Sequence, residues 1–104
     1  MSYANCFVCQ KHQGDVPIPG GIIYEDDLAC VSHSIIPEGE NTTYLGIFFV
    51  EPKRHAAGWA ELTEAEAQRV GLLIQRVSHA LQVSEGAEHI YTFTFGHHVD
   101  HLHV

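Results

Sequence analysis

Four histidines stand among the last eight residues of the chain, HHVDHLHV. If residues 99–104 form a β-strand, alternate side chains face the same way, so His101 and His103 project from one face with their Cβ atoms roughly 7 Å apart. Two such imidazoles can bind a metal ion, or one of them can attack phosphorus in line and form a phosphoramidate that water later cleaves. They can also be ordinary structural histidines, and the spacing alone leaves all three interpretations open.

Cys6 and Cys9 form a CxxC motif near the start of the chain. This spacing lets one tetrahedral zinc ion take two thiolates, and histidines would have to supply the other ligands because no second CxxC exists. A redox pair is a weaker interpretation, since the thioredoxin-like βαβ context is missing, and a CxxC without metal is the third. Cys30 stands alone in an apolar run and is expected to be a small core residue. His55 follows a predicted strand, and by composition alone it would be a surface loop histidine.

Length, composition and charge limit the class of protein. The 104 residues fit a single domain, and a hydrophobic fraction of 45% with a mean hydropathy of −0.04 is typical of a globular chain. A net charge of −8 argues against a nucleic-acid polymer as partner, because such binding normally needs a basic stripe. No apolar run approaches the roughly 20 residues that span a bilayer, and the N-terminus lacks the pattern of a signal peptide. We therefore expect no membrane contact and a cytoplasmic location.

The elements that position these residues follow from periodicity and turn signals. Five segments carry the apolar or alternating pattern of β-strands: residues 22–24, 28–31, 44–50, 89–95 and 99–104. The acidic turn Glu25-Asp26-Asp27 joins the first two, which predicts a hairpin. Thr63 and Glu66 form a capping box and Gly86 closes the apolar stripe that follows, which predicts one long helix. This order predicts an α+β fold with a mainly antiparallel sheet packed against that helix.

Together these motifs resemble the histidine triad (HIT) family. The run from Gly96 to Val104 is similar to the family's last strand, whose signature is His-φ-His-φ-His-φ-φ after a Gly-x-x-Val-x lead-in. The CxxC, the acidic turn, the run from Gly46 to His55 and the helix cap at 62–66 are similar to the family in order and spacing. The resemblance implies a HIT-like fold for a single domain of residues 1–104. The first two triad histidines are His101 and His103, and the third would fall at position 105, so the domain is expected to be C-terminally incomplete.

The resemblance also implies roles for the site residues. The second triad histidine is the family's nucleophile, which makes His103, supported by His101, the expected catalytic pair. In zinc-containing relatives the CxxC, a histidine after the third strand and the first triad histidine hold a structural metal. The corresponding zinc ligands are Cys6, Cys9, His55 and His101. The expected substrate-binding residues are His97 and His98 near the phosphate and Ser32 and His33 near the ribose.

The implied activity is that of a nucleotidyl hydrolase or transferase. Its substrates would be nucleoside phosphoramidates or dinucleoside polyphosphates, cleaved through a nucleotidyl-histidine intermediate, and the protein would be a homodimer. Two alternatives stay open. One is a nucleotide- or zinc-binding module without catalysis. The other is a metal-dependent hydrolase that uses His101 and His103 as catalytic ligands, for which chelation would abolish activity at once.

Overall fold

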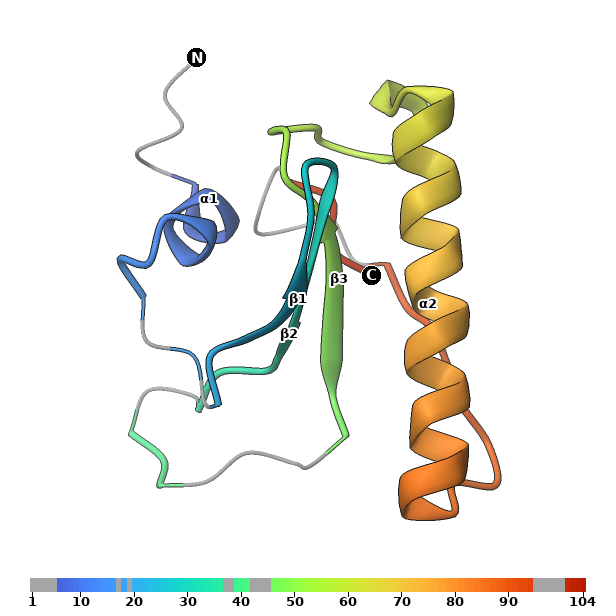
Figure 1. Ribbon diagram of the computed structural model, residues 1–104. Coiled ribbons are helices and arrows are strands. Elements are labelled where there is room, and N and C mark those ends of the chain that lie inside the picture. Colours follow the sequence, from blue (N-terminus) through green and yellow to red (C-terminus); the bar gives the residue numbers. More distant parts are fainter. Residues whose placement is uncertain (1–5, 17, 19, 37–38, 42–45, 95–100) are drawn as a thin grey trace.

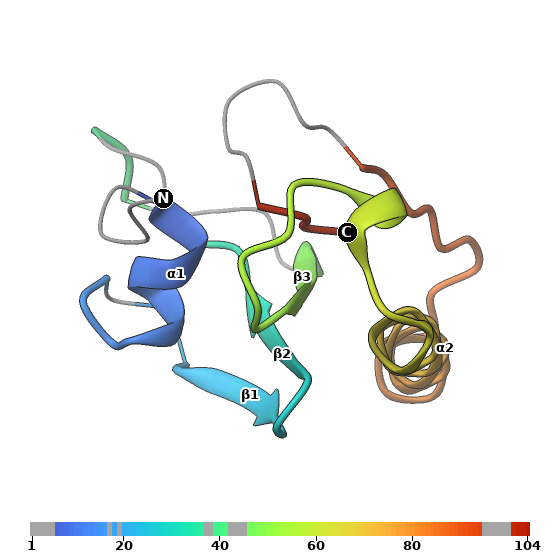
Figure 2. The same cartoon turned by 90° about the horizontal axis from the view of Figure 1, so that it is seen from above.

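The computed structural model describes residues 6–16, 18, 20–36, 39–41, 46–94 and 101–104. Its elements, in chain order, are helix α1 (Phe7–His12), strands β1 (Ile22–Glu25), β2 (Ala29–His33) and β3 (Phe48–Pro52), the 3-10 turn η2 (Trp59–Glu61) and helix α2 (Glu64–Glu85). The strands form one antiparallel sheet in the order β1-β2-β3, and this sheet lies between α1 and α2 (Figures 1 and 2). The predicted α+β class is confirmed.

The turn between β1 and β2 forms as predicted and is closed by one aspartate. Oδ1 of Asp26 accepts hydrogen bonds from the backbone N–H groups of Leu28 at 2.8 Å and Ala29 at 2.9 Å. Such side-chain bonding to the following backbone is the reason aspartate favours turns. Oδ2 accepts a hydrogen bond from the Tyr24 hydroxyl and pairs with Arg69 of α2. The hairpin is thereby tied to the long helix.

Helix α2 begins and ends where the sequence predicts. Oγ1 of Thr63 accepts a hydrogen bond from the N–H of Glu66 at 3.1 Å, and the Glu66 carboxylate accepts one from the N–H of Thr63 at 2.8 Å. These reciprocal bonds complete the capping box. Gly86 ends the helix with φ at 65°, a left-handed conformation that glycine adopts without steric cost.

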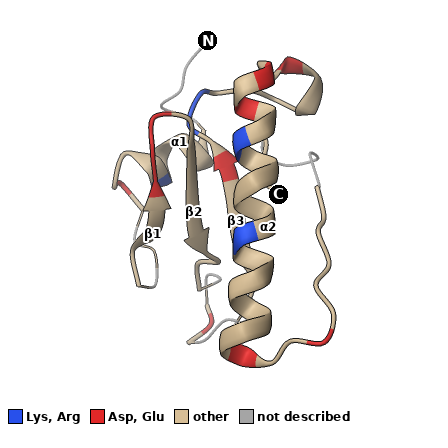
Figure 3. Cartoon of the chain, turned by 45° about the vertical axis from the view of Figure 1, so that its right-hand side comes forward, with Lys and Arg blue, Asp and Glu red and all other residues tan. Residues whose placement is uncertain are grey.

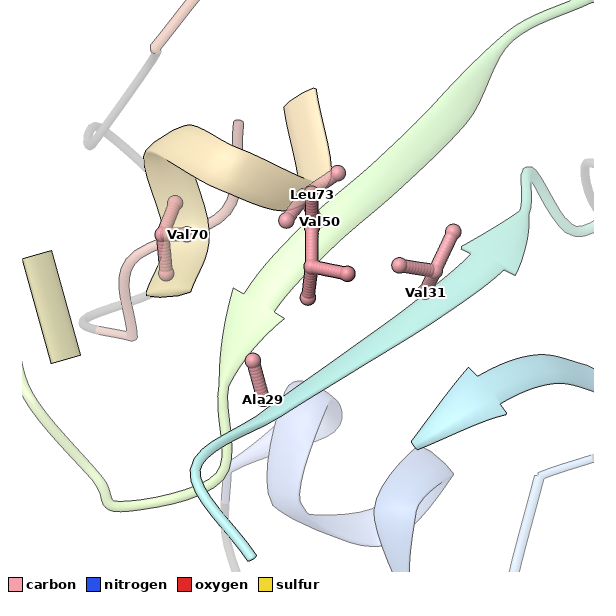
Figure 4. Packing of buried hydrophobic residues seen from close by; sticks show 5 residues of the cluster. All are labelled: Ala29, Val31, Val50, Val70 and Leu73. Atoms are coloured by element: carbon pink, nitrogen blue, oxygen red, sulfur yellow. The ribbon is translucent and has the colours of Figure 1, made fainter. Parts of the chain in front are cut away.

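The hydrophobic core lies between the sheet and α2 (Figure 4). Its buried members are Ala29, Val31, Val50, Val70 and Leu73. Because side chains alternate along a strand, the neighbours of Val50 on β3 face the other way, toward α1. Glu51 binds Lys11 of α1, and the Lys11 ammonium lies 4.6 Å from the centre of the Phe49 ring. The sheet therefore has an apolar face toward α2 and a partly polar face toward α1.

Two predicted strands do not form regular strands in the structure, and the one predicted at 44–50 is found as β3, from Phe48 to Pro52. The described residues 89–94 form no strand, and Tyr91 and Phe93 are 73% and 61% exposed. Their alternation suits a strand face, but a strand also requires a hydrogen-bonded neighbour, and these residues form no ladder with the described strands. Residues 101–104 are not a regular strand either, although they run beside β3. Val50 and Val104 exchange N–H···O bonds of 2.9 and 3.1 Å, which aligns the last residues with the sheet.

Most basic side chains of the chain are neutralised by ion pairs. Of the 5 Lys and Arg residues, four pair with described carboxylates: Lys11 with Glu51, Lys53 with Glu25, Arg54 with Glu66 and Arg69 with Asp26. Acidic residues gather at the β1–β2 turn and at both ends of α2 (Figure 3). The described part of the chain thus presents no basic stripe. No helix in that part is both long and apolar enough to cross a bilayer.

Candidate metal centre and reactive histidine

The four predicted metal ligands come together on the α1 side of the sheet. Cys6 is the N-cap of α1 and Cys9 lies three residues later, a spacing that puts both thiols on one side of the helix. His55 follows β3, and His101 lies in the segment that runs beside β3. One ligand atom from each residue lies within 4.8 Å of all the others. Cys6, Cys9 and His101 are buried, and His55 is half-buried.

The distances within this cluster fit a tetrahedral zinc ion. Zinc–sulfur bonds of about 2.3 Å and zinc–nitrogen bonds of about 2.0 Å place sulfur and nitrogen ligands about 3.5 Å apart at tetrahedral angles. Nδ1 of His101 lies 3.4 Å from Sγ of Cys6 and 3.4 Å from Sγ of Cys9. Nδ1 of His55 lies 3.5 Å from Sγ of Cys9. These three sulfur–nitrogen distances therefore match the spacing of ligands around one zinc ion.

A backbone carbonyl fixes the ring of His101 in the orientation that a metal ligand needs. Nε2 donates a hydrogen bond of 2.7 Å to the carbonyl of Pro52, the last residue of β3. The proton is therefore on Nε2, and the lone pair of Nδ1 points toward the two sulfur atoms. Burial lowers the pKa of His101, which keeps the ring neutral and able to donate that lone pair.

The thiol of Cys9 needs a cation in order to ionise. Burial, followed by the hydrogen bond and charge of Cys6, raises the pKa of Cys9 to about 11. Such a thiol holds its proton at neutral pH unless a metal ion replaces it. A cavity of about 360 Å³ borders Cys9 and His55 and gives an ion a route to the ligands.

A buried charged group stands beside the ligands, and sequence analysis missed it. Glu51 of β3 is 1% exposed, and its two oxygens bind Nζ of Lys11 at 3.0 Å and Nε2 of His12 at 3.1 Å. Burial alone would raise the pKa of Glu51, but the hydrogen bond from His12 and the charge of Lys11 lower it. The available signal was the acidic residue in an otherwise apolar strand, because a buried charge requires a partner.

His103 is not one of the four metal ligands that cluster among the described residues. Its Nδ1 donates a hydrogen bond of 2.8 Å to the backbone carbonyl of His101, so the lone pair belongs to Nε2. No described residue makes a hydrogen bond to Nε2. The ring meets that of Phe49 edge to face, with 5.9 Å between the ring centres. The geometry gives His103 a fixed tautomer and leaves Nε2 without a hydrogen-bond partner among the described residues.

His103 also borders a cavity with a volume of about 450 Å³. Its walls are β3, one face of α2, residues 90–93 and the last two residues. The C-terminal part of the apolar stripe of α2, including Leu81, faces this space rather than a packed core. A volume of this size is in the range of small-molecule sites.

The other predicted substrate-binding residues differ in whether their polar side-chain atoms already have hydrogen-bond partners. Ser32 is buried in β2, and its Oγ has no hydrogen-bond partner among the described residues. Nδ1 of His33 donates to the carbonyl of Ser34 at 3.0 Å, and Nε2 accepts from the N–H of Gly46 at 3.1 Å. Both nitrogens of His33 thus bond to backbone groups, one just after β2 and one shortly before β3. His97 and His98 lie outside the described residues.

Comparison with known proteins gives structural relatives. No family model and no curated protein matches the chain. A hypothetical protein from Leishmania major matches with 27% identity and a TM-score of 0.79, over 98% of this chain and 71% of that one. A HIT family hydrolase from Clostridium thermocellum matches with 25% identity and a TM-score of 0.66, over 98% and 88%. A zinc-bound histidine triad family protein from Mycobacterium smegmatis matches with 21% identity and a TM-score of 0.78, over 98% and 73%.

The fold is therefore that of solved histidine triad proteins, and the two cysteines and two histidines form a cluster that could hold a metal ion. The resemblance to the HIT family that the sequence motifs indicate is confirmed by solved HIT structures that cover nearly the whole chain.

Proposed function

We propose that this protein is a nucleotidyl hydrolase or transferase of the histidine triad type and that His103 is its nucleophile. The observation that carries the proposal is the hydrogen bonding of the His103 ring and its place beside a cavity. Its Nδ1–H is held by the His101 carbonyl, its Nε2 is free of described partners, and it borders a cavity of about 450 Å³. The solved relatives named HIT family hydrolases support a hydrolytic reaction.

In the proposed reaction, the lone pair of Nε2 attacks the α-phosphorus of a nucleotide and forms a phosphorus–nitrogen bond. The bond from phosphorus to the leaving group breaks, and the leaving group takes a proton from solvent. The carbonyl of His101 stabilises the positive charge that the ring gains, because it accepts the hydrogen bond from Nδ1. Water then attacks phosphorus, the phosphorus–nitrogen bond breaks and returns its electron pair to Nε2, and the proton of the water passes to solvent. The nucleoside monophosphate leaves and the neutral ring is restored.

We propose a small nucleotide, a nucleoside phosphoramidate or a dinucleoside polyphosphate, as substrate. The net charge of −8 and the pairing of four cations disfavour a nucleic-acid polymer. Ser32 alternates with Val31, which packs toward α2, so Ser32 faces α1 and is not among the residues that line the His103 cavity. Its role toward the ribose stays a prediction. The homodimer and the cytoplasmic location stay predictions.

We propose a structural role for zinc. Four protein side chains complete a tetrahedral set, which leaves no position for a metal-bound water. The ion would supply a link between α1 and the segment that carries His103, and the chemistry would stay with the imidazole. His103 bonds to a backbone carbonyl rather than joining the ligands, and this disfavours the metal-dependent hydrolase.

Turnover of a nucleoside phosphoramidate tests the proposal. The wild-type chain should release the amine, His103→Ala should lose at least about 1,000-fold in rate, and His79→Ala, an exposed histidine of α2, should be unaffected. Binding of a mononucleotide without any turnover would overturn the enzymatic claim and favour the binding module. Immediate loss of activity on chelation, with the fold intact, would instead favour the metal-dependent hydrolase.

A further inference from the structure

Helix α1 carries two of the four metal ligands although it is only six residues long. A helix of this length is not stable alone, so contacts with the sheet must hold it. Its apolar contribution is small, because Phe7 is 36% exposed and Val8 is the large apolar side chain that it buries. The thiols can meet the histidines only if something else fixes the rotation of α1 on the sheet.

The carboxylate of Glu51 provides that constraint. Lys11 and His12 are consecutive residues of α1, and each binds a different oxygen of Glu51, at 3.0 and 3.1 Å. Consecutive side chains leave a helix about 100° apart, so one carboxylate that binds both fixes the rotation of the helix as well as its position. The side chains of the three residues are nearly inaccessible to solvent, with exposures of 3%, 9% and 1% for Lys11, His12 and Glu51.

The same stretch of β3 also positions the histidine ligand. Pro52 follows Glu51 in the chain, and its carbonyl holds Nε2 of His101 at 2.7 Å. The edge of the His12 ring meets the His101 ring, with 5.6 Å between centres and an angle of 88°. Glu51 therefore orients the thiol-bearing helix, and the next residue orients the imidazole that those thiols meet.

We propose that Glu51, through Lys11 and His12, is the positioning residue of the metal centre and increases its affinity for zinc. The proposal rests on the zinc site of the proposed function. Groups that orient metal ligands typically contribute about 10- to 100-fold to metal affinity. Glu51→Gln keeps the shape of the side chain but leaves one accepting oxygen, so it cannot accept from both Lys11 and His12 on separate oxygens and the constraint on rotation is weakened.

The test is a zinc titration of the whole chain against a chromophoric chelator. Glu51→Gln should weaken zinc binding by about 10- to 100-fold. Glu64→Gln, an exposed carboxylate of α2, should leave the affinity unchanged. His12→Phe keeps a ring beside His101 but loses the bond to Glu51, and it should also weaken binding. Adding His12→Phe to Glu51→Gln should weaken it little further, because both act through one network.

Unfolding in excess chelator and in excess zinc separates positioning from general stability. If Glu51→Gln lowers both stabilities equally and the zinc affinity of both variants stays at the wild-type value, the positioning role is refuted. A wild-type chain that binds no zinc would instead refute the metal site of the proposed function. If the glutamine variant does not fold, the His12→Phe titration decides the inference alone.

Discussion

Replacing Glu66 with glutamine should lower the free energy of unfolding by about 2 kcal/mol at pH 7 and by almost nothing near pH 2. The Glu66 carboxylate accepts hydrogen bonds from Nε and Nη2 of Arg54 at 3.0 and 2.9 Å. This pair ties the start of α2 to the residue before the candidate ligand His55. The hydrogen bonds from Arg54 lower the pKa of Glu66 from 4.5 to about 2.

The magnitude follows from that change and from the exposure of the partner. A pKa lowered to about 2 corresponds to roughly 3.4 kcal/mol of preference for the charged form. The side chain of Arg54 is 49% exposed, so solvent screening reduces the stabilisation to about 2 kcal/mol. Because the folded pKa lies below the unfolded one, this stabilisation is complete above about pH 5 and disappears as the pH falls toward 2.

Urea unfolding between pH 7 and pH 2.5, in chelator throughout, measures the effect. Glutamine can keep the capping bond to the N–H of Thr63, so Glu66→Gln removes the charge and retains the cap. Glu64→Gln controls for the interaction with the helix dipole, because Glu64 lies in the same turn and makes no ion pair with a described residue. A loss of stability in Glu66→Gln that is equal at both ends of the pH range would refute the electrostatic reasoning.

Three further predictions test the core, the helix end and the metal site. Val70→Ala, at a position with 0% exposure, should lower the free energy of unfolding by about 2 kcal/mol in urea titrations, because it leaves a cavity under α2. Gly86→Ala should lower the free energy of unfolding by about 1 kcal/mol, because the backbone there has φ at 65°. Gly71→Ala, inside α2 with free space where a Cβ would lie, should raise it by about 0.5–1 kcal/mol. Differential scanning calorimetry should show melting temperatures that move in opposite directions. Cys9→Ser should abolish stoichiometric zinc in elemental analysis, and Cys30→Ala should retain it.

The parts of the fold that local chemistry determines could be predicted from the sequence. The turn at Asp26 and the limits of α2 depend on side chains within three residues of the backbone groups that they bind, so their signals are visible in a short stretch of sequence. The segment from 89 onward could not be predicted in this way. Its aromatic alternation describes one face of a strand, but strand pairing depends on what lies beside it, and the described residues 89–94 do not form a strand.

The four metal ligands were predicted by resemblance. The structure brings them together, although Cys6 and His101 are 95 residues apart in the sequence. The contacts around it could not be predicted, because each depends on a meeting of distant segments. Glu51 and Lys11 are 40 residues apart, and the bond from His101 to the carbonyl of Pro52 spans 49. For His103, the two-residue spacing indicates a shared face but not which nitrogen is free.

The most direct test of the account is the mass of the protein during turnover. A reaction with a nucleoside phosphoramidate, quenched within seconds, should show a fraction of the chain heavier by one nucleotidyl group. Peptide mapping should place that group on His103, and the adduct should be absent from His103→Ala. Turnover with the nucleotidyl group on another residue, or with no adduct in the quenched enzyme under any condition, would contradict the claim that His103 is the nucleophile.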